Sequence, residues 1–275
     1  SGKCHNYTEK SWNRTRLEYE ELCFSAIMKN PSSRLIATGH NFARHLIGNY
    51  GVSFTERDYL VNGLLFDNYL VPANRRSTLK DVRRYVPELS YKNKIIFSWG
   101  RLSQAKGFYE ILQAWEAIVD DYPDYCLVLQ APTSCIEEME FFERFKSKAK
   151  SVPRVFHIDD FSPKIWQCFL RYNKTCVVCL ASVMDPNPHT PIEAKLFAKD
   201  MNYAILASFK DGIKDSFNID DCVSLKDPYD ITDFSEKLEY AINLKPETKK
   251  EMAKSKNIYN KAYLLGSISA GYKLA

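Results

Sequence analysis

Short apolar runs rich in β-branched and aromatic residues alternate with amphipathic stretches along the chain from about residue 94. The runs predict strands at residues 94–98, 125–129, 155–158, 175–180 and 203–207. Between and after them, apolar residues recur at the three-and-four spacing of helices that pack one face on a sheet. Helices are expected at residues 111–119, 136–150, 165–172, 191–198, 231–242 and 246 to about 262. This alternation predicts an α/β fold, a Rossmann-like parallel sheet with helices on both faces.

The first ninety residues follow a different pattern. They predict helices at residues 16–28 and 42–50 and strands at residues 34–37 and 59–61. These elements are too few to close a second Rossmann-like domain, so we interpret them as the end of an incomplete N-terminal domain. The predicted domains are residues 1–71 for this remnant, 72–90 for a linker rich in Arg, Lys, Asn and Pro, 91–245 for the main domain and 246–275 for a C-terminal helical segment.

The composition is that of an ordinary folded chain, with 45% hydrophobic and 26% charged residues. A net charge of +4 is too small to indicate nucleic-acid binding, which usually requires a dense basic surface. No apolar run approaches the roughly 18 to 20 residues of a membrane-spanning helix, and the N-terminus lacks the apolar core of a signal peptide. The eight irregularly spaced cysteines indicate reduced thiols, so we expect a cytoplasmic location.

Cys176 and Cys179 form a C-x-x-C pair, which in other settings binds metal or carries redox chemistry. Here the pair lies within Thr-Cys-Val-Val-Cys-Leu, a run typical of a buried strand, and the chain lacks a second such pair. We therefore prefer a structural role for both thiols, and no metal site is predicted.

A glycine-flanked loop follows the first predicted strand of the main domain and leads into a helix. It contains Gly100, Arg101, Lys106 and Gly107. In α/β folds ligands bind at the carboxyl ends of the strands, and a diphosphate there requires an Arg fork, an ammonium group and free backbone N–H groups. Arg101 and Lys106 could both reach one pyrophosphate; the alternative is a solvated loop with two incidental charges. The G-x-x-x-x-G-K-[ST] pattern of nucleoside triphosphatases is absent.

A proline-rich loop follows the strand predicted at residues 175–180. Asp185 lies just after this strand, and Thr190 with Pro191 resembles an N-cap followed by the first helical residue. Glu193 then falls in the first turn, where its carboxylate could accept hydrogen bonds from sugar hydroxyls. The alternative is ordinary surface acidity that complements the helix dipole.

Taken together, the two loops resemble the C-terminal domain of the retaining glycosyltransferases of family 4, which adopt the GT-B fold. The resemblance covers about residues 30 to 245. A further similarity is the Asn62-Gly63-Leu64 turn, which matches the turn before the interdomain linker in that family. The matching positions of the main domain are Gly100-Arg101, Lys106-Gly107, Asp185 with Glu193, and the loop at residues 207–213 that ends in Asp-Gly-Ile.

The resemblance implies transfer of a sugar from a UDP- or GDP-sugar to a hydroxyl acceptor in glycan biosynthesis, with retention of the anomeric configuration. The implied catalytic residues are Arg101 and Lys106 on the diphosphate, Glu193 on the ribose hydroxyls and Asp185 facing the donor sugar. Further donor contacts are expected from Gly100, Asn187, Pro188, His189 and Thr190. No metal or other cofactor is expected, because cations of the protein take that role in GT-B enzymes.

The chain departs from the family pattern at two places. Asp185 stands where the family usually has Glu, which shortens the reach of the carboxylate by roughly 1.5 Å, and Pro-Asn-Pro-His replaces the usual Phe-Gly. The expected partners are a nucleoside-diphosphate sugar and a glycan, lipid or protein acceptor, with peripheral membrane contact and no nucleic acid. Three explanations of the small N-terminal part stay open: a shortened fragment, a split enzyme, or a domain that binds donors without turnover. A dinucleotide-binding or flavodoxin-like module is the alternative function, although G-x-G-x-x-G is absent.

Overall fold

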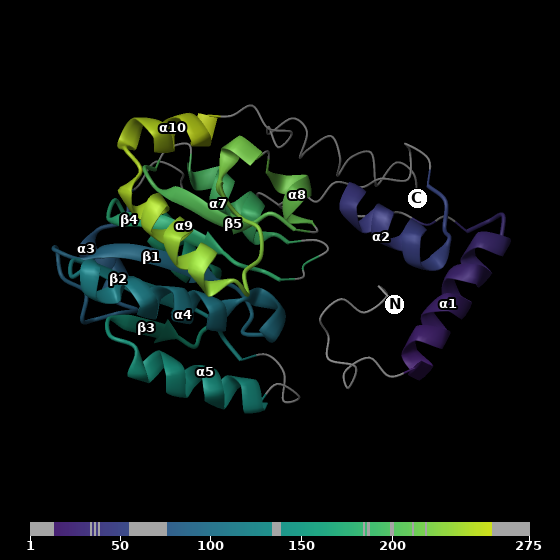
Figure 1. The fold of residues 1–275 in the computed structure, drawn as a ribbon, viewed down its shortest axis with the longest axis horizontal. Coiled ribbons are helices and arrows are strands. Elements are labelled where there is room, and N and C mark those ends of the chain that lie inside the picture. The colour runs from purple at the N-terminus through teal and green to yellow at the C-terminus, as the bar shows by residue number, and fades with distance from the viewer. Residues whose placement is uncertain are drawn as a thin grey trace.

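The structure, a computed structural model, describes residues 14–33, 35, 37, 39–54, 76–133, 139–183, 185, 188–198, 201–210, 212–217 and 219–254. In that part of the chain a six-stranded parallel sheet carries helices on both faces (Figure 1). The strands are β1 (Lys94–Trp99), β2 (Tyr125–Gln130), β3 (Val155–Ile158), β4 (Thr175–Leu180), β5 (Ala204–Ser208) and β6 (Val223–Leu225). The predicted α/β fold is confirmed, and the five predicted strands begin and end within one residue of their predicted bounds.

The helices of the sheet domain also follow the predicted pattern. Two further helices, α1 (Arg14–Lys29) and α2 (His40–Tyr50), precede the domain. Short 3-10 turns are η3 (Gln104–Lys106), η4 (Val119–Asp121) and η6 (Ile219–Asp221). The helices of the domain are α3 (Leu79–Val82), α4 (Phe108–Ile118), α5 (Met139–Ser151), α6 (Pro163–Leu170), α7 (Thr190–Ala198), α8 (Ile213–Ser216), α9 (Ile231–Asn243) and α10 (Pro246–Lys254).

Strand β6 is absent from the sequence-based prediction. It has three residues, Val-Ser-Leu, which is shorter than the strands that apolar patterning can identify. It pairs with β5 alone, with Leu206 opposite Val223 and Ser208 opposite Leu225, and is one of the two edge strands of the described sheet. The extended conformation of these three residues therefore depends on their hydrogen bonds to β5 more than on their own sequence.

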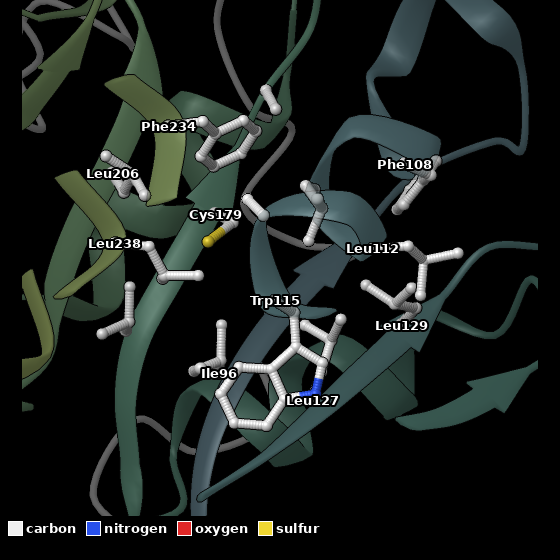
Figure 2. Close-up of a cluster of buried hydrophobic side chains, with 14 of the residues drawn as sticks. Ile96, Phe108, Leu112, Trp115, Leu127, Leu129, Cys179, Leu206, Phe234 and Leu238 are labelled. Carbon is white, nitrogen blue, oxygen red and sulfur yellow. The ribbon is translucent and has the colours of Figure 1, made fainter. Parts of the chain in front are cut away.

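Two apolar cores lie on opposite faces of the sheet. One is formed with α4, α5 and α9, and Figure 2 shows Trp115, Phe108 and Phe234 in it. The stripe predicted on α4, from Ile111 to Val119, is buried there. Each large apolar side chain buried in this way contributes about 1.5–3 kcal/mol to folding. The second core is formed with α3, α6 and α7, so the helices hold the strand ends, and the loops that follow them, in place from both sides.

Residues 76–90 belong to the predicted linker, but the structure folds them onto the second core. Ser77 pairs with Tyr172, and the side chains of Val82, Val86 and Leu89 are buried. The described part of the predicted linker is therefore packed on the sheet domain by apolar residues at a helical spacing. The limits of the predicted domains are not tested and stay a prediction.

Helix α2 lies beside the sheet domain near α8, and α1 packs against α2 farther from the sheet (Figure 1). The backbone N–H and the side-chain amide of Asn41 donate hydrogen bonds to the carboxylate of Asp215, at 3.1 and 2.8 Å. Tyr50 on α2 donates to Glu20 on α1 at 2.7 Å. The N-terminal helices are therefore attached to the sheet domain by a charged contact. The strand predicted at residues 59–61, the turn at residues 62–64 and the helix beyond residue 254 lie outside the described residues.

Candidate active site

The two loops singled out in the sequence follow strands that are neighbours in the sheet. The strand order β3-β2-β1-β4-β5-β6 places β1 beside β4. From β1 the chain first adds strands on one side of the sheet, β2 and β3, and then on the other side, β4 to β6, so the order reverses between β1 and β4. In sheets of this order ligands bind in the crevice outside the carboxyl ends of the strands at this reversal. The structure therefore brings both loops to the edge of the sheet where a ligand is expected.

The loop after β1 is attached to the sheet on both of its sides. The N–H groups of Gly100 and Leu102 donate to the carbonyl oxygens of Gln130 and Pro132 at 3.0 and 2.9 Å, on the side of β2. On the side of β4, the N–H of Val183 donates to the carbonyl oxygen of Ala105 at 2.9 Å. These bonds fix the backbone that carries Arg101 and Lys106.

Gly107 ends this loop and begins α4. Its φ is 68°, and a Cβ built there would lie 2.1 Å from the carbonyl oxygen of Ala181 at the end of β4. Only glycine fits such an approach. The N-terminus of α4 is thereby pressed against the end of β4, and its free N–H groups and positive dipole end lie at the crevice.

Lys106 and Asp185 form an ion pair between the two loops, with the ammonium nitrogen hydrogen-bonded to Oδ2. Their side chains are 21% and 12% exposed, so the pair is largely buried. Arg101 is exposed and has no hydrogen bond or ion pair with any residue in the described ranges. The structure thus joins Lys106 to Asp185 and leaves the side chain of Arg101, in the same loop as Lys106, exposed to solvent.

Glu193 lies in the first turn of α7 and is buried. Its Oε2 accepts a hydrogen bond from the indole N–H of Trp99 at 2.7 Å. Burial raises the pKa of Glu193 to about 7, although the bond from Trp99 and the positive charge of Lys106 act in the opposite direction. The carboxyl group is therefore expected to exchange its proton near neutral pH, unlike an exposed glutamate.

Trp99 is the residue of this site that the sequence analysis did not single out. It is the last residue of β1, a position at which an aromatic residue is ordinary core material. A signal was present, because a tryptophan at the last position of a strand places its indole N–H close to the ligand edge of the sheet. Nothing local indicates that the acceptor would be Glu193, 94 residues later.

The remaining predicted donor contacts are placed only in part. Pro188 is buried and His189 is exposed, while Asn187 lies outside the described residues. The helix begins at Thr190, and the carbonyl oxygen of His189 accepts from the N–H of Glu193 at 3.0 Å. His189 therefore occupies the N-cap position that was predicted for Thr190, an error of one residue in the register of the helix start.

The part of the chain that the structure describes contains no group of three or more His, Cys, Asp or Glu residues arranged to hold a metal ion. Cys176 and Cys179 are free thiols of β4, as their sequence context predicts, and burial raises the pKa of both. None of the described helices is both long and apolar enough to span a membrane.

The strand order and the loops at its reversal define a Rossmann-like α/β domain, with a cationic loop after β1 and acidic residues after β4. The chain belongs to the glycosyl transferases group 1 family, whose sequence model matches residues 81–261. This match includes both loops of the candidate site and the whole of the sheet.

Individual relatives agree with this assignment. The chain is 28% identical over 130 residues to an uncharacterized glycosyltransferase of Haemophilus influenzae, a match to 47% of this chain and 31% of that protein. Its fold is similar to an α,α-trehalose-phosphate synthase (UDP-forming) of Burkholderia vietnamiensis, with a TM-score of 0.67, 15% identity and coverage of 86% of this chain and 56% of that one. It is also similar to a protein described as trehalose-6-phosphate from E. coli bound with UDP-2-fluoro glucose, with a TM-score of 0.59, 15% identity and coverage of 77% and 48%. The chain therefore spans about half the length of these two solved structures and less of the Haemophilus protein.

Proposed function

We propose that the protein is a glycosyltransferase, or the donor-binding part of one. The proposed reaction moves a sugar from a nucleoside-diphosphate sugar to a hydroxyl acceptor with retention of the anomeric configuration, as in family 4. The observation that carries the proposal is the meeting of Lys106, Asp185 and Glu193 at the strand reversal of a glycosyl transferases group 1 domain. Lys106 and Asp185 come from the loops after the neighbouring strands β1 and β4, and Glu193 comes from the first turn of α7, so all three lie at the edge of the sheet where a ligand is expected.

The chemical difficulty of this reaction is charge separation. Positive charge develops at the anomeric carbon while negative charge accumulates on the departing diphosphate. Lys106, Arg101 and the N-terminus of α4 supply positive potential on one side of the crevice. The diphosphate is expected to share or replace Asp185 as the partner of Lys106, and Arg101 is accessible for a two-pronged contact.

Asp185 and Glu193 are assigned different parts of the donor. Asp185 lies beside Lys106 and therefore close to the proposed diphosphate, where it would face the sugar. Glu193 lies deeper, in the first turn of α7, and is proposed to hold the ribose hydroxyls. Asp185 pairs with Lys106 despite being one methylene shorter than the usual Glu, so the substitution retains a carboxylate in the site.

We propose uracil as the base of the donor, so that the donor is a UDP-sugar. The Burkholderia relative is described as UDP-forming and the E. coli relative as bound with UDP-2-fluoro glucose. The acceptor is a glycan, lipid or protein hydroxyl, and no metal or other cofactor is part of the proposal. The six free cysteines among the described residues are typical of a reducing compartment, in agreement with the expected cytoplasmic location.

Donor binding is the part of the reaction that the sheet domain is proposed to perform. In a GT-B enzyme an N-terminal domain closes over the donor and binds the acceptor, and we interpret α1 and α2 as part of that domain. Acceptor binding is then expected to involve the N-terminal domain, whereas nucleotide binding is expected of the sheet domain.

Calorimetric titration with UDP and with GDP tests the proposal, and thermal shift with UDP, GDP, ADP, NAD and FMN extends it. We expect stabilisation by a nucleoside diphosphate, with UDP binding more tightly than GDP. Binding of NAD or FMN alone would instead favour a dinucleotide-binding or flavodoxin-like module and refute the transferase.

Variants of the two cations locate the nucleotide. Lys106→Ala and Arg101→Ala are each expected to weaken UDP binding about tenfold or more, because each removes a charge-assisted hydrogen bond. In a complete enzyme the same variants are expected to lower turnover by about two or more orders of magnitude. Lys148→Ala is the matched control, because Lys148 is 23% exposed and paired with Glu116 away from the site. Unchanged UDP binding in both variants would remove the assignment.

A further inference from the structure

Trp99 lies at the end of β1, next to the candidate site but outside the list of its proposed ligands. It is 5% exposed, and the carboxylate of Glu193 to which it donates belongs to a residue that is 6% exposed. Within the described part of the chain no other side chain hydrogen-bonds to this carboxylate. The orientation of Glu193 therefore depends on one indole N–H.

The indole of Trp99 is itself held on two sides. Its ring is stacked on Phe97, with centroids 5.5 Å apart and an angle of 12°, and on Trp166 of α6, at 5.9 Å and 18°. Trp166 in turn meets Phe197 of α7 edge-on at 5.9 Å. Such contacts fix the plane of the indole, so its N–H points in one direction.

We propose that Trp99 is a positioning residue for donor recognition: its indole N–H holds Oε2 of Glu193 so that Oε1 is presented to the ribose hydroxyls. This inference rests on the proposed function, in which Glu193 is the ribose ligand. An indole N–H is a donor only, so it cannot compete with the carboxylate for a ribose hydroxyl proton. A carboxylate with one oxygen fixed and the other accessible presents its acceptor without loss of further side-chain freedom on binding.

The same hydrogen bond affects the charge of Glu193. Burial raises the pKa of the carboxyl group, and the indole N–H together with the positive charge of Lys106 limits this effect. The other titratable groups nearby are Asp185, which is paired with Lys106, and His189, which precedes α7. Without the indole donor only Lys106 would counteract burial, so the pKa of Glu193 would rise further and more of the carboxyl group would be protonated at neutral pH.

The substitution Trp99→Phe removes the N–H and keeps an aromatic ring in the stack. We expect it to weaken UDP binding about tenfold and to reduce the preference for UDP over 2′-deoxy-UDP, which measures the ribose contact directly. UDP affinity should increase as pH rises through about 7 in the wild type, and this increase should move to higher pH in the variant. Wild-type affinity, preference and pH profile in a folded Trp99→Phe protein would overturn the inference.

Trp115→Phe is the matched control. Trp115 is also a buried tryptophan, and its indole N–H donates one hydrogen bond, to the carbonyl oxygen of Pro153 at 3.1 Å on the other face of the sheet. Loss of this hydrogen bond should lower the stability of the protein about as much as Trp99→Phe does. It should leave the affinity for UDP and the preference for the 2′-hydroxyl unchanged. Equal losses of affinity in both variants would show a general structural effect and refute the positioning role.

A measurement on the nucleotide-free protein separates this inference from the proposed function. The chain has four tryptophans, so their indole N–H signals can be assigned by substitution and followed by NMR. The Trp99 signal should titrate with Glu193 near pH 7 in the wild type and should stop titrating in Glu193→Gln. If the chemical shift of the Trp99 indole N–H does not change with the titration of Glu193, the proposed hydrogen bond between them is refuted, even if UDP binds. A wild type that binds no nucleoside diphosphate refutes the proposed function, and the donor role of Trp99 with it, even if the signal titrates.

Discussion

The buried carboxyl group of Glu193 is expected to make the stability of the protein depend on pH. Its pKa is about 7 in the folded chain against an ordinary value of 4.5. Between these two values the unfolded chain has lost the proton of Glu193 while the folded chain still holds it. The folded state then binds more protons than the unfolded state, so the free energy of unfolding falls as pH rises through this window. Above pH 7 the loss is complete and constant.

The size of this effect follows from the difference between the two pKa values. Each pH unit of difference corresponds to about 1.4 kcal/mol, so the wild type loses about 3 kcal/mol between the two ends of the window. Glu193→Gln removes the titrating group, while its amide oxygen can still accept the hydrogen bond from Trp99. We therefore expect the variant to be about 3 kcal/mol more stable than the wild type near pH 8 and close to it near pH 5, although it no longer presents a charged acceptor to the donor.

Urea unfolding of the wild type and the variant at a series of pH values measures the difference directly. All other titrating groups are common to both proteins and cancel in that difference. Glu236→Gln, on the exposed side of α9, is the matched control and should show no pH-dependent difference from the wild type. If the difference between Glu193→Gln and the wild type is the same from about pH 5 to about pH 8, the raised pKa and the argument based on it are refuted.

Three further predictions concern the framework of the site. Gly107→Ala should lower the free energy of unfolding by about 3 kcal/mol or more, because its Cβ would meet the carbonyl oxygen of Ala181 in a left-handed backbone conformation. The control Gly51→Ala, at φ 64° with no atom within 4 Å, should lower it by about 1–2 kcal/mol. Equal losses of stability in thermal denaturation would contradict the close approach at Gly107. Thr78→Ala should cost about 1 kcal/mol by removing the capping box of α3, with Ser235→Ala as control, because the Ser235 hydroxyl donates only to the carbonyl oxygen of Thr232 within α9 and caps no helix. Asp215→Ala should speed hydrogen exchange in α2 but not in α4, since Asn41 loses its two bonds; unchanged exchange in α2 would show that the contact does not hold the N-terminal helices.

Local patterning was sufficient for most of the main domain. The strands buried on both faces appear in the sequence as continuous apolar runs, and the stripe on α4 repeats at the period of a helix, so both could be recognised without tertiary information. The prediction failed where the pattern was weak. Strand β6 has three residues and depends on β5, and the polar composition of residues 76–90 masks the buried face formed by Val82, Val86 and Leu89.

The residue types of the candidate site were also predictable, because the chemistry of a diphosphate and a ribose calls for cations and a carboxylate. Their partners were not. Lys106 and Asp185 are 79 residues apart, and their pairing requires that β1 and β4 be neighbours. The bond from Trp99 to Glu193 requires in addition that α7 pack on the face where the indole is stacked.

The sequence by itself thus determined the fold class, the positions of the loops and the candidate charges, since these depend on local periodicity and residue chemistry. Only the tertiary structure decided which charges meet, how deeply Glu193 is buried and which group orients it. The physical reason is that burial and hydrogen-bond partners depend on strand order and helix packing, which join residues far apart in the chain. These same long-range contacts raise the pKa of Glu193 and give Trp99 its proposed role.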